Sequence, residues 1–242
     1  MIRELAPAKV NLVLRVGPVA KNGLHEVCSL FASLVLADVI EVEESDEDRV
    51  VCAGVEGPNL AATALRAFRT GHKWLKGGPA PVAPLEVRID KRIPVAGGLA
   101  GGSADAAAVL RCANELAGRP FGPHVLRALA ANLGSDVPSQ IEPGHAIVRG
   151  TGERVEPVAL PEMALALVPA AQGLSTADVF AEADRLAIPR AQLGCGDLRD
   201  IAAMEAPAIA ARLENDLQAA ALSLRPELAH TLEAVGGLGA QV

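Results

Sequence analysis

Three stretches of the chain predict β-strands, and the first and third of them alternate apolar and polar residues with a period of two, which is the spacing of a half-buried strand. The first covers residues 10–16 and places Lys9 and Asn11 together on the polar face. The others cover residues 35–43 and 85–89. The pattern therefore predicts a sheet, and the third strand leads directly into the most glycine-rich part of the chain.

Longer stretches have apolar residues at helical spacing and end at glycine, proline or polar residues. They predict helices over residues 60–75, 123–133, 175–188, 202–224 and 227–235, the fourth with a break at Pro207. A hairpin is expected over residues 145–160, with GTGE at its turn, and a short apolar strand over residues 164–168. The best domain boundary falls near residues 156–162.

Charge excludes one class of function. The chain has 242 residues, with 22 Lys+Arg against 29 Asp+Glu, and so a formal net charge of −7 at pH 7. Nucleic-acid binders hold phosphates with clustered basic residues, and the longest basic block here is the pair Lys91-Arg92. We therefore expect no nucleic-acid partner. Half of the residues are hydrophobic but only 2% are aromatic, so Ala, Val and Leu must build the core.

The cysteines and the N-terminus favour a cytoplasmic protein. The four cysteines are Cys28, Cys52, Cys112 and Cys195. They lie far apart with no CxxC motif, so the expectation is four reduced thiols and no zinc site. Glu4 and Lys9 interrupt the stretch that a signal peptide would keep apolar, and no run approaches the ~20 apolar residues of a membrane helix. We expect no membrane association.

The segment over residues 91–117 carries the clearest chemistry. It reads KRIPVAGGLAGGSADAAAVLRCANELA, a glycine-rich loop between a strand and a helix that stops at Gly118 and Pro120. Backbone N–H groups and the helix dipole at such a loop bind anions, and phosphate is the obvious ligand. The segment is neither a Walker A loop nor a GxGxxG motif. Ser103 is expected to cap the helix and to lie near a phosphate-bound metal. Alternatively, the glycines only let the helix pack closely on the sheet.

PVAGGLAGGSADAA at residues 94–107 resembles the phosphate-binding loop of the GHMP kinase superfamily. Five further motifs extend the resemblance over almost the whole chain: APAKVNLVLRV (6–16), GLHEV (23–27), LGSDVP (133–138), GTGE (150–153) and LSTADVF (174–180). Together and in this order they resemble, within that superfamily, the 4-diphosphocytidyl-2-C-methyl-D-erythritol kinases.

The resemblance implies an α+β fold with two lobes. The N-terminal lobe, residues 1–157, would be of the ribosomal protein S5 domain 2-like type and carry the ATP-binding loop. Residues 158–242 would form an incomplete C-terminal α/β-sandwich lobe, with the active site between the lobes. The protein is expected to be a monomer or a weak homodimer.

The resemblance also implies ATP-dependent phosphorylation of the 2-hydroxyl of 4-diphosphocytidyl-2-C-methyl-D-erythritol, in non-mevalonate isoprenoid synthesis. Lys9 and Asp136 match the catalytic pair of the family. Asp136 would accept the hydroxyl proton, and Lys9 would hold the hydroxyl and keep the carboxylate ionised. Taken singly, Lys9 would be interpreted first as an exposed strand lysine, and a turn-capping role is also common for an aspartate placed like Asp136.

Further residues are assigned by resemblance. His25 would hydrogen-bond the cytosine edge and Phe180 would stack on that base, although Phe180 also fits ordinary core packing. Asn11 and Thr176 are also expected at the substrate. Mg²⁺ would bridge the phosphates near Ser103. The expected ATP-binding residues are Lys91, Pro94, Val95, Ala96, Gly97, Gly98, Leu99, Ala100, Gly101, Gly102, Ser103 and Ala104.

Two departures from the family pattern leave alternatives open. Leu24 stands where the family has a tyrosine that stacks on the cytosine. The chain also ends in GGLGAQV, without the family's third glycine-rich loop; residues 236–239 are not that loop, because they follow the helix over residues 227–235 directly. We expect a truncated chain that binds ATP weakly and turns over slowly. The alternatives are another GHMP kinase, acting on homoserine or mevalonate, and a nucleotide-binding remnant.

Overall fold

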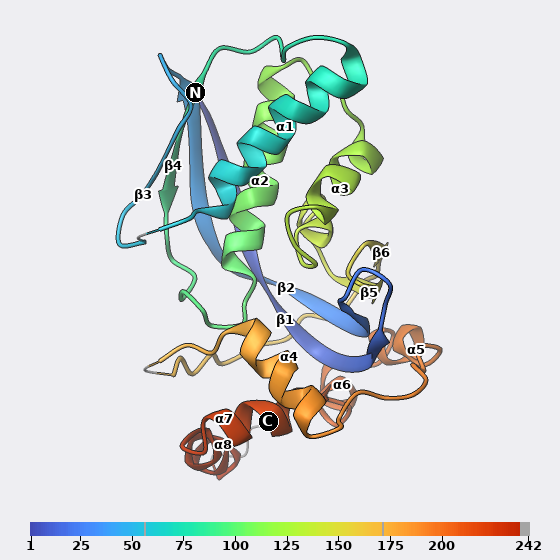
Figure 1. Cartoon of the computed structure of the whole chain (residues 1–242). Coiled ribbons are helices and arrows are strands. Elements are labelled where there is room, and N and C mark those ends of the chain that lie inside the picture. The colour runs from blue at the N-terminus through green and yellow to red at the C-terminus, as the bar shows by residue number, and fades with distance from the viewer. Residues whose placement is uncertain (56, 171, 238–242) are drawn as a thin grey trace. The chain divides into compact units, whose positions relative to one another are not determined.

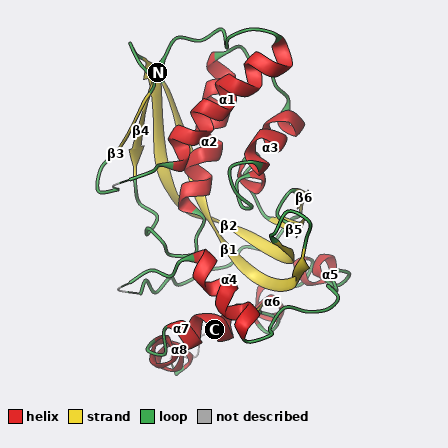
Figure 2. Ribbon diagram, viewed as in Figure 1, coloured by secondary structure: helices red, strands yellow, loops and turns green. Residues whose placement is uncertain are grey.

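The computed structural model describes residues 1–55, 57–170 and 172–237 (Figures 1 and 2). The strands are β1 (Ile2–Val19), β2 (His25–Glu44), β3 (Arg49–Cys52), β4 (Leu85–Asp90), β5 (Ala146–Gly150), β6 (Arg154–Pro157) and β7 (Glu214–Asn215). The helices are α1 (Leu60–Lys76), α2 (Gly101–Leu116), α3 (Pro123–Ala131), the 3₁₀ turn η1 (Pro138–Gln140), α4 (Thr176–Arg185), α5 (Leu198–Ala202), α6 (Ala206–Ala210), α7 (Gln218–Leu224) and α8 (Leu228–Gly236). No helix in these ranges has both the length and the apolarity needed to cross a membrane.

The chain forms two compact units that interleave in sequence. The first unit comprises Met1–Lys9, Ser33–Val95 and Leu99–Gly144. The second comprises Val10–Ala32, Ala96–Gly98 and His145–Val242. The long strands β1 and β2 therefore contribute residues to both units. A lobe boundary at residue 157 is a different division of the chain and stays a prediction.

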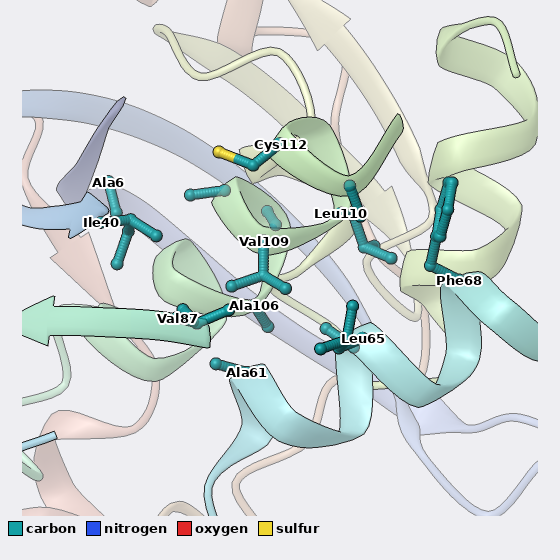
Figure 3. Packing of buried hydrophobic residues seen from close by; sticks show 14 of the residues in the cluster. Ala6, Ile40, Ala61, Leu65, Phe68, Val87, Ala106, Val109, Leu110 and Cys112 are labelled. Atoms are coloured by element: carbon teal, nitrogen blue, oxygen red, sulfur yellow. The ribbon is translucent and has the colours of Figure 1, made fainter. Parts of the chain in front are cut away.

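The first unit packs three helices on a sheet. Within it, β4 pairs antiparallel with the second half of β2, from Val39 to Glu44, and parallel with β3. Helices α1 and α2 lie side by side, and Figure 3 shows buried residues of β1, β2 and β4 packed with residues of these two helices. Residues of α3 also belong to this core. Leu65 and Phe68 of α1 are fully buried in this core, as the helical spacing predicts.

Local signals fix both ends of α1. The Asn59 side chain accepts a hydrogen bond from the Ala61 N–H at 2.9 Å, which satisfies one of the unpaired donors of the first turn. The helix ends at Gly77, whose φ of 77° is left-handed and suits glycine. The prediction of a helix over residues 60–75 is thus confirmed to within one residue.

The second unit has strand pairs of its own. The first half of β2, from Val27 to Phe31, pairs antiparallel with β5. Strands β5 and β6 form the hairpin predicted over residues 145–160, with the GTGE sequence at its turn. Strand β1 pairs parallel with the short β7 at Val13 and Leu14.

Cys28 and Cys195 form a disulfide, which contradicts the expectation of four reduced thiols. They are 167 residues apart in the chain, but the fold brings their Cα atoms to 5.9 Å, within the ordinary range for a disulfide. Spacing along the sequence could not reveal this pair. Cys52 and Cys112 are free.

Three further expectations need correction. Strand β2 begins at residue 25 rather than 35, because its first half pairs with β5.

The strand predicted over residues 164–168 is wrong. These residues have no ladder partner within the described ranges, and Leu165, Leu167 and Val168 are exposed. An apolar run predicts a strand only when a neighbour supplies its hydrogen bonds.

The helix predicted over residues 202–224 is also wrong in outline, because α5, α6, β7 and α7 occupy that region. Pro207 lies in the first turn of α6, where proline is tolerated, so the interruptions fall on either side of it. The helix predicted over residues 227–235 is confirmed as α8. Of the final GGLG stretch, residues 238 and 239 lie outside the described residues.

Candidate active site

The glycine-rich segment, residues 94–104, leads into α2 with an unusual backbone conformation. Every second residue is left-handed, with φ of 56° at Ala96, 72° at Gly98 and 56° at Ala100. Alternation of right-handed and left-handed residues is a conformation in which successive N–H groups can turn to the same side, and we interpret this segment as an anion-binding concavity. The first helical bond runs from the Ala104 N–H to the Ala100 carbonyl at 2.9 Å, so the preceding N–H groups of α2 have no acceptor within the helix.

Ser103 is not the helix cap. Helix α2 begins two residues earlier, at Gly101, and the left-handed Ala100 occupies the cap position without a side-chain hydrogen bond. Ser103 therefore lies in the first turn, where its hydroxyl and N–H sit at the positive end of the helix dipole.

Two kinds of glycine occur in this segment. A Cβ added at Gly98 or Gly102 would meet no atom within 4 Å, so these positions leave open space beside the backbone. A Cβ at Gly101 would lie 3.0 Å from the Ile93 side chain and 3.1 Å from Lys91 Nζ. Close packing therefore accounts for Gly101, whereas the open positions suit the approach of a ligand to the main chain.

Lys9 and Asp136 lie together in the first unit, beside the glycine-rich segment. Lys9 Nζ is 3.4 Å from Asp136 Oδ2, and the Lys9 N–H donates to the Leu99 carbonyl at 3.1 Å. The Lys9 side chain is buried, while a third of the Asp136 side chain is exposed. A buried ammonium therefore faces an accessible carboxylate next to backbone that can hold an anion.

The turn that presents Asp136 is ordered by its own backbone. The Val137 N–H donates to the Gly134 carbonyl, and the Ser139 hydroxyl donates to the carbonyl of Asp136. These bonds leave the Asp136 carboxylate directed toward Lys9. A carboxylate in this place can accept a proton from a group bound beside it.

Lys91 forms ion pairs with two carboxylates. Its ammonium contacts Asp38 Oδ2 and lies 2.9 Å from Asp105 Oδ2. Burial raises the pKa of Asp105 to about 7, although the hydrogen bond from Lys91 opposes the rise. Burial alone would lower the pKa of Lys91, but its two carboxylate partners outweigh that effect and raise it. Direct contact between Lys91 and a nucleotide stays a prediction.

His25 and Phe180 lie together in the second unit. Their rings stack with centroids 5.4 Å apart and planes 20° apart. His25 Nδ1 lies 2.8 Å from the Gly17 carbonyl, which can only accept, so Nδ1 carries hydrogen. His25 Nε2 lies 3.2 Å from an Asp184 carboxylate oxygen. The half-buried Phe180 is thus part of an aromatic pair rather than of the core.

Asn11 and Thr176 complete the expected substrate residues, and both belong to the second unit. The Asn11 amide donates to the Ser29 hydroxyl at 2.8 Å. Thr176 is the exposed first residue of α4, one turn before Phe180, so the two share a helix face. Leu24 is half exposed and directly precedes His25.

Comparison with known proteins agrees with this geometry. Residues 59–144 match the model of the GHMP kinases N terminal domain. The 4-diphosphocytidyl-2-C-methyl-D-erythritol kinase of Nocardia farcinica is 42% identical over 241 residues, which cover 95% of this chain and 76% of the relative. The enzyme of the same name from Leifsonia xyli subsp. xyli is 39% identical over 250 residues, which cover 94% and 79%. The chain belongs to the 4-diphosphocytidyl-2-C-methyl-D-erythritol kinase family.

Solved structures support this assignment to the family. A crystal structure of 4-(cytidine 5'-diphospho)-2C-methyl-D-erythritol kinase matches with a TM-score of 0.71 and 31% identity, covering 98% of this chain and 84% of that one. The mevalonate pyrophosphate decarboxylase of Streptococcus pyogenes, at 12% identity and a TM-score of 0.53, shares only the fold. The GHMP kinase fold with mixed α and β elements, expected from the motifs, is confirmed.

A magnesium ion at this site would take most of its ligands from a bound nucleotide rather than from side chains. Over the described ranges, no three His, Cys, Asp or Glu side chains form a cluster that could hold a metal ion. Mg²⁺ in kinases keeps several waters and takes most of its other ligands from substrate phosphates, so no such cluster is required. The Ser103 hydroxyl, in the first turn of α2, is the protein oxygen suited to join that shell.

Sequence reasoning missed the partners of several family residues. Asp184 contacts His25, Ser29 holds Asn11, and Asp38 and Asp105 hold Lys91. Only Asp184 had a local signal, since it lies one helical turn after Phe180 on α4. The other partners come from elements that the fold alone brings near.

Proposed function

We propose that this chain catalyses ATP-dependent phosphorylation of the 2-hydroxyl of 4-diphosphocytidyl-2-C-methyl-D-erythritol. The observation that carries the proposal is the Lys9–Asp136 pair beside the glycine-rich segment. Phosphoryl transfer needs a group to accept the hydroxyl proton, positive charge near the reacting oxygens and a cradle for the phosphates. The first unit contains the carboxylate, the ammonium and, in the first turn of α2, N–H groups that can hold phosphate.

Asp136 is the base of the proposed reaction. Its carboxylate is accessible, and ionised it can take the proton of the attacking hydroxyl. Lys9 holds the hydroxyl oxygen with its ammonium and lowers the cost of charge at that oxygen in the transition state. Because the Lys9 backbone is bonded to Leu99, this ammonium has a fixed place relative to the phosphate-binding backbone.

The glycine-rich segment binds the nucleotide in this proposal. Residues 94–104 offer N–H groups from the concavity and from the first turn of α2, where the helix dipole favours negative charge. ATP supplies the phosphoryl group, and Mg²⁺ offsets phosphate charge beside Ser103.

The second unit carries the residues proposed for the cytidine end of the substrate. The His25–Phe180 pair presents aromatic ring faces, on which a flat heterocycle can stack, while both ring nitrogens of His25 lie within hydrogen-bond distance of protein groups. Asn11 offers an amide, and Thr176 adds a hydroxyl on the same helix face as Phe180. These assignments rest on the family motifs together with this geometry.

Substrate-dependent ATP turnover tests the function. Purified protein is assayed with the diphosphocytidyl alcohol, with homoserine and with mevalonate, each at the same ATP and Mg²⁺ concentrations. We expect turnover only with the first alcohol. Turnover with homoserine or mevalonate instead would identify another GHMP kinase. ATP binding without turnover of any alcohol would contradict the proposal for this chain.

Asp136→Asn tests the base. The amide keeps the size of the side chain but cannot accept the proton, and general-base catalysis contributes about 10²–10⁴-fold, so kcat should fall by at least about 100-fold. The matched control is Asp200→Asn, the same change at an exposed position on α5. A kcat for Asp136→Asn within a factor of three of the control would contradict the assignment.

A further inference from the structure

A buried charge cluster in the first unit contacts the backbone that leads into the glycine-rich segment. Asp38 is fully buried, Asp105 is 3% exposed, and the Lys91 ammonium contacts both. We call these three residues the Asp38–Lys91–Asp105 cluster. They come from β2, from the end of β4 and from α2, so three separate elements meet at one ammonium.

The cluster holds both ends of the glycine-rich segment. Before the segment, Asp38 Oδ1 accepts hydrogen bonds from the Arg92 N–H at 2.6 Å and the Ile93 N–H at 2.8 Å. After the segment, Asp105 lies in the second turn of α2 and binds Lys91 at 2.9 Å. The ammonium therefore joins the backbone that enters the segment to the helix that leaves it.

This arrangement is costly as a source of stability alone. Two buried carboxylates share one ammonium, and Asp105 Oδ1 is buried with no hydrogen-bond partner among the described residues. Buried charges repay their desolvation only when geometry and hydrogen bonding are nearly complete. The Lys91 ammonium also packs tightly against the backbone of Gly101, because a Cβ added there would lie 3.1 Å from Lys91 Nζ. Such a cost suggests a role in shaping the segment.

We propose that Asp38, Lys91 and Asp105 are positioning residues for the nucleotide, which hold the two ends of the segment over residues 94–104 so that its N–H groups can bind phosphate. Lys91 acts through its two carboxylate partners and does not contact the phosphates. This inference rests on the proposed function for the identity of the ligand. The positioning of the backbone by the Asp38–Lys91–Asp105 cluster in the unliganded protein holds whichever ligand binds.

A phosphate-binding role and a positioning role of Lys91 predict opposite changes in nucleotide affinity when Asp105 is replaced. If Lys91 bound phosphate, removing the acid Asp105 would free the ammonium and strengthen nucleotide binding. If Lys91 positions the segment, removing Asp105 breaks the connection and weakens binding. The sign of the Asp105→Ala effect therefore separates the two roles.

The first measurement is hydrogen–deuterium exchange of the unliganded full chain. In Lys91→Met, backbone amides of residues 91–104 should exchange at least tenfold faster than in the wild type, whereas those of α3 (Pro123–Ala131) should not change. The control is Arg92→Met, which removes an exposed basic side chain one residue away. Unchanged exchange over residues 91–104 in a folded Lys91→Met protein would overturn the proposal.

The second measurement is the Kd of adenylyl imidodiphosphate with Mg²⁺, by titration calorimetry. We expect Lys91→Met and Asp105→Ala each to raise the Kd about tenfold, and the double variant to be no worse than either. In steady-state assays, KM for ATP should rise while KM for the alcohol stays within twofold. Tighter binding by Asp105→Ala would overturn the proposal. Absence of binding by the wild type would refute the proposed function, and exchange would still decide the positioning role.

Discussion

Replacing Asp105 with asparagine should remove a pH dependence from the stability of the protein. Burial raises the pKa of this carboxyl from 3.8 to about 7 in the folded state. Between these values the folded protein holds the proton more tightly than the unfolded chain does. The contribution of the protonated Asp105 carboxyl to the free energy of unfolding is therefore complete below pH 3.8, and it is lost as the pH rises through 7.

The size of the effect follows from the shift. A pH of 5 is two units below the folded-state pKa of this carboxyl, about 7, and lies above its ordinary pKa of 3.8. Each pKa unit corresponds to about 1.4 kcal/mol. The free energy of unfolding should thus fall by about 3 kcal/mol between pH 5 and pH 8 from this group alone. The charged or titratable groups that face Asp105 are Lys91, Asp38 and Cys52. Burial, followed by the charge of Asp105, raises the pKa of Cys52, so its thiol stays neutral in this window.

Urea denaturation at pH 5, 6, 7 and 8 measures the effect as the difference between wild type and Asp105→Asn. The subtraction removes contributions from the other titrating groups, and the isosteric amide can still accept a hydrogen bond from Lys91. Asp90→Asn, at a carboxylate whose side chain is 62% exposed, serves as the control and should leave the slope unchanged. A wild-type minus Asp105→Asn difference that is constant from pH 5 to pH 8 would refute the reasoning.

Three further predictions follow from the packing and the site. Gly101→Ala should lower the free energy of unfolding by about 1–3 kcal/mol, because the new methyl group meets Ile93 and Lys91; Gly102→Ala, with open space at its Cβ, should not, and equal urea midpoints for the two variants would contradict this. Alkylation of the denatured, unreduced protein should label two of the four cysteines by mass spectrometry, because Cys28 is paired with Cys195, and four labels would show that the pair is open. Leu24→Tyr should lower KM for the diphosphocytidyl substrate about fivefold with kcat unchanged, since stacking of an aromatic side chain on a base contributes about 1 kcal/mol or more; an unchanged KM would show that this position does not contact the base.

The elements that sequence pattern predicted well are those with local signals at both ends. Helix α1 has an asparagine cap and a left-handed glycine, and the β5–β6 hairpin has GTGE at its turn. Residues 164–168 had only an apolar run, and no neighbouring strand of the described residues pairs with them. Strand β2 was cut short for the related reason that its first half depends on pairing with β5, a segment more than 100 residues away.

The residues of the candidate site also differ in whether a local sequence signal marks them. The motifs indicated Lys9 and Asp136 because each stands in a recognisable local sequence, and the structure brings them to 3.4 Å. Ser103 was placed wrongly as a helix cap, because the left-handed Ala100 starts α2 before the first residue with a capping side chain. Backbone conformation at an alanine leaves no trace in residue type, so no pattern of side chains could have located that start.

Lys91 shows why charge near a phosphate loop is an ambiguous signal. In the sequence it is a basic residue three positions before the glycine-rich segment, which favours a phosphate ligand. The structure surrounds its ammonium with carboxylates 53 and 14 residues away, and one of them also binds the backbone that leads into the segment. A lysine neutralised by two acids has little charge left to offer a phosphate, but its three donors can still fix the elements that carry those acids. The same residue type at the same distance from the loop can therefore serve as ligand or as support, and the acids around it decide between them.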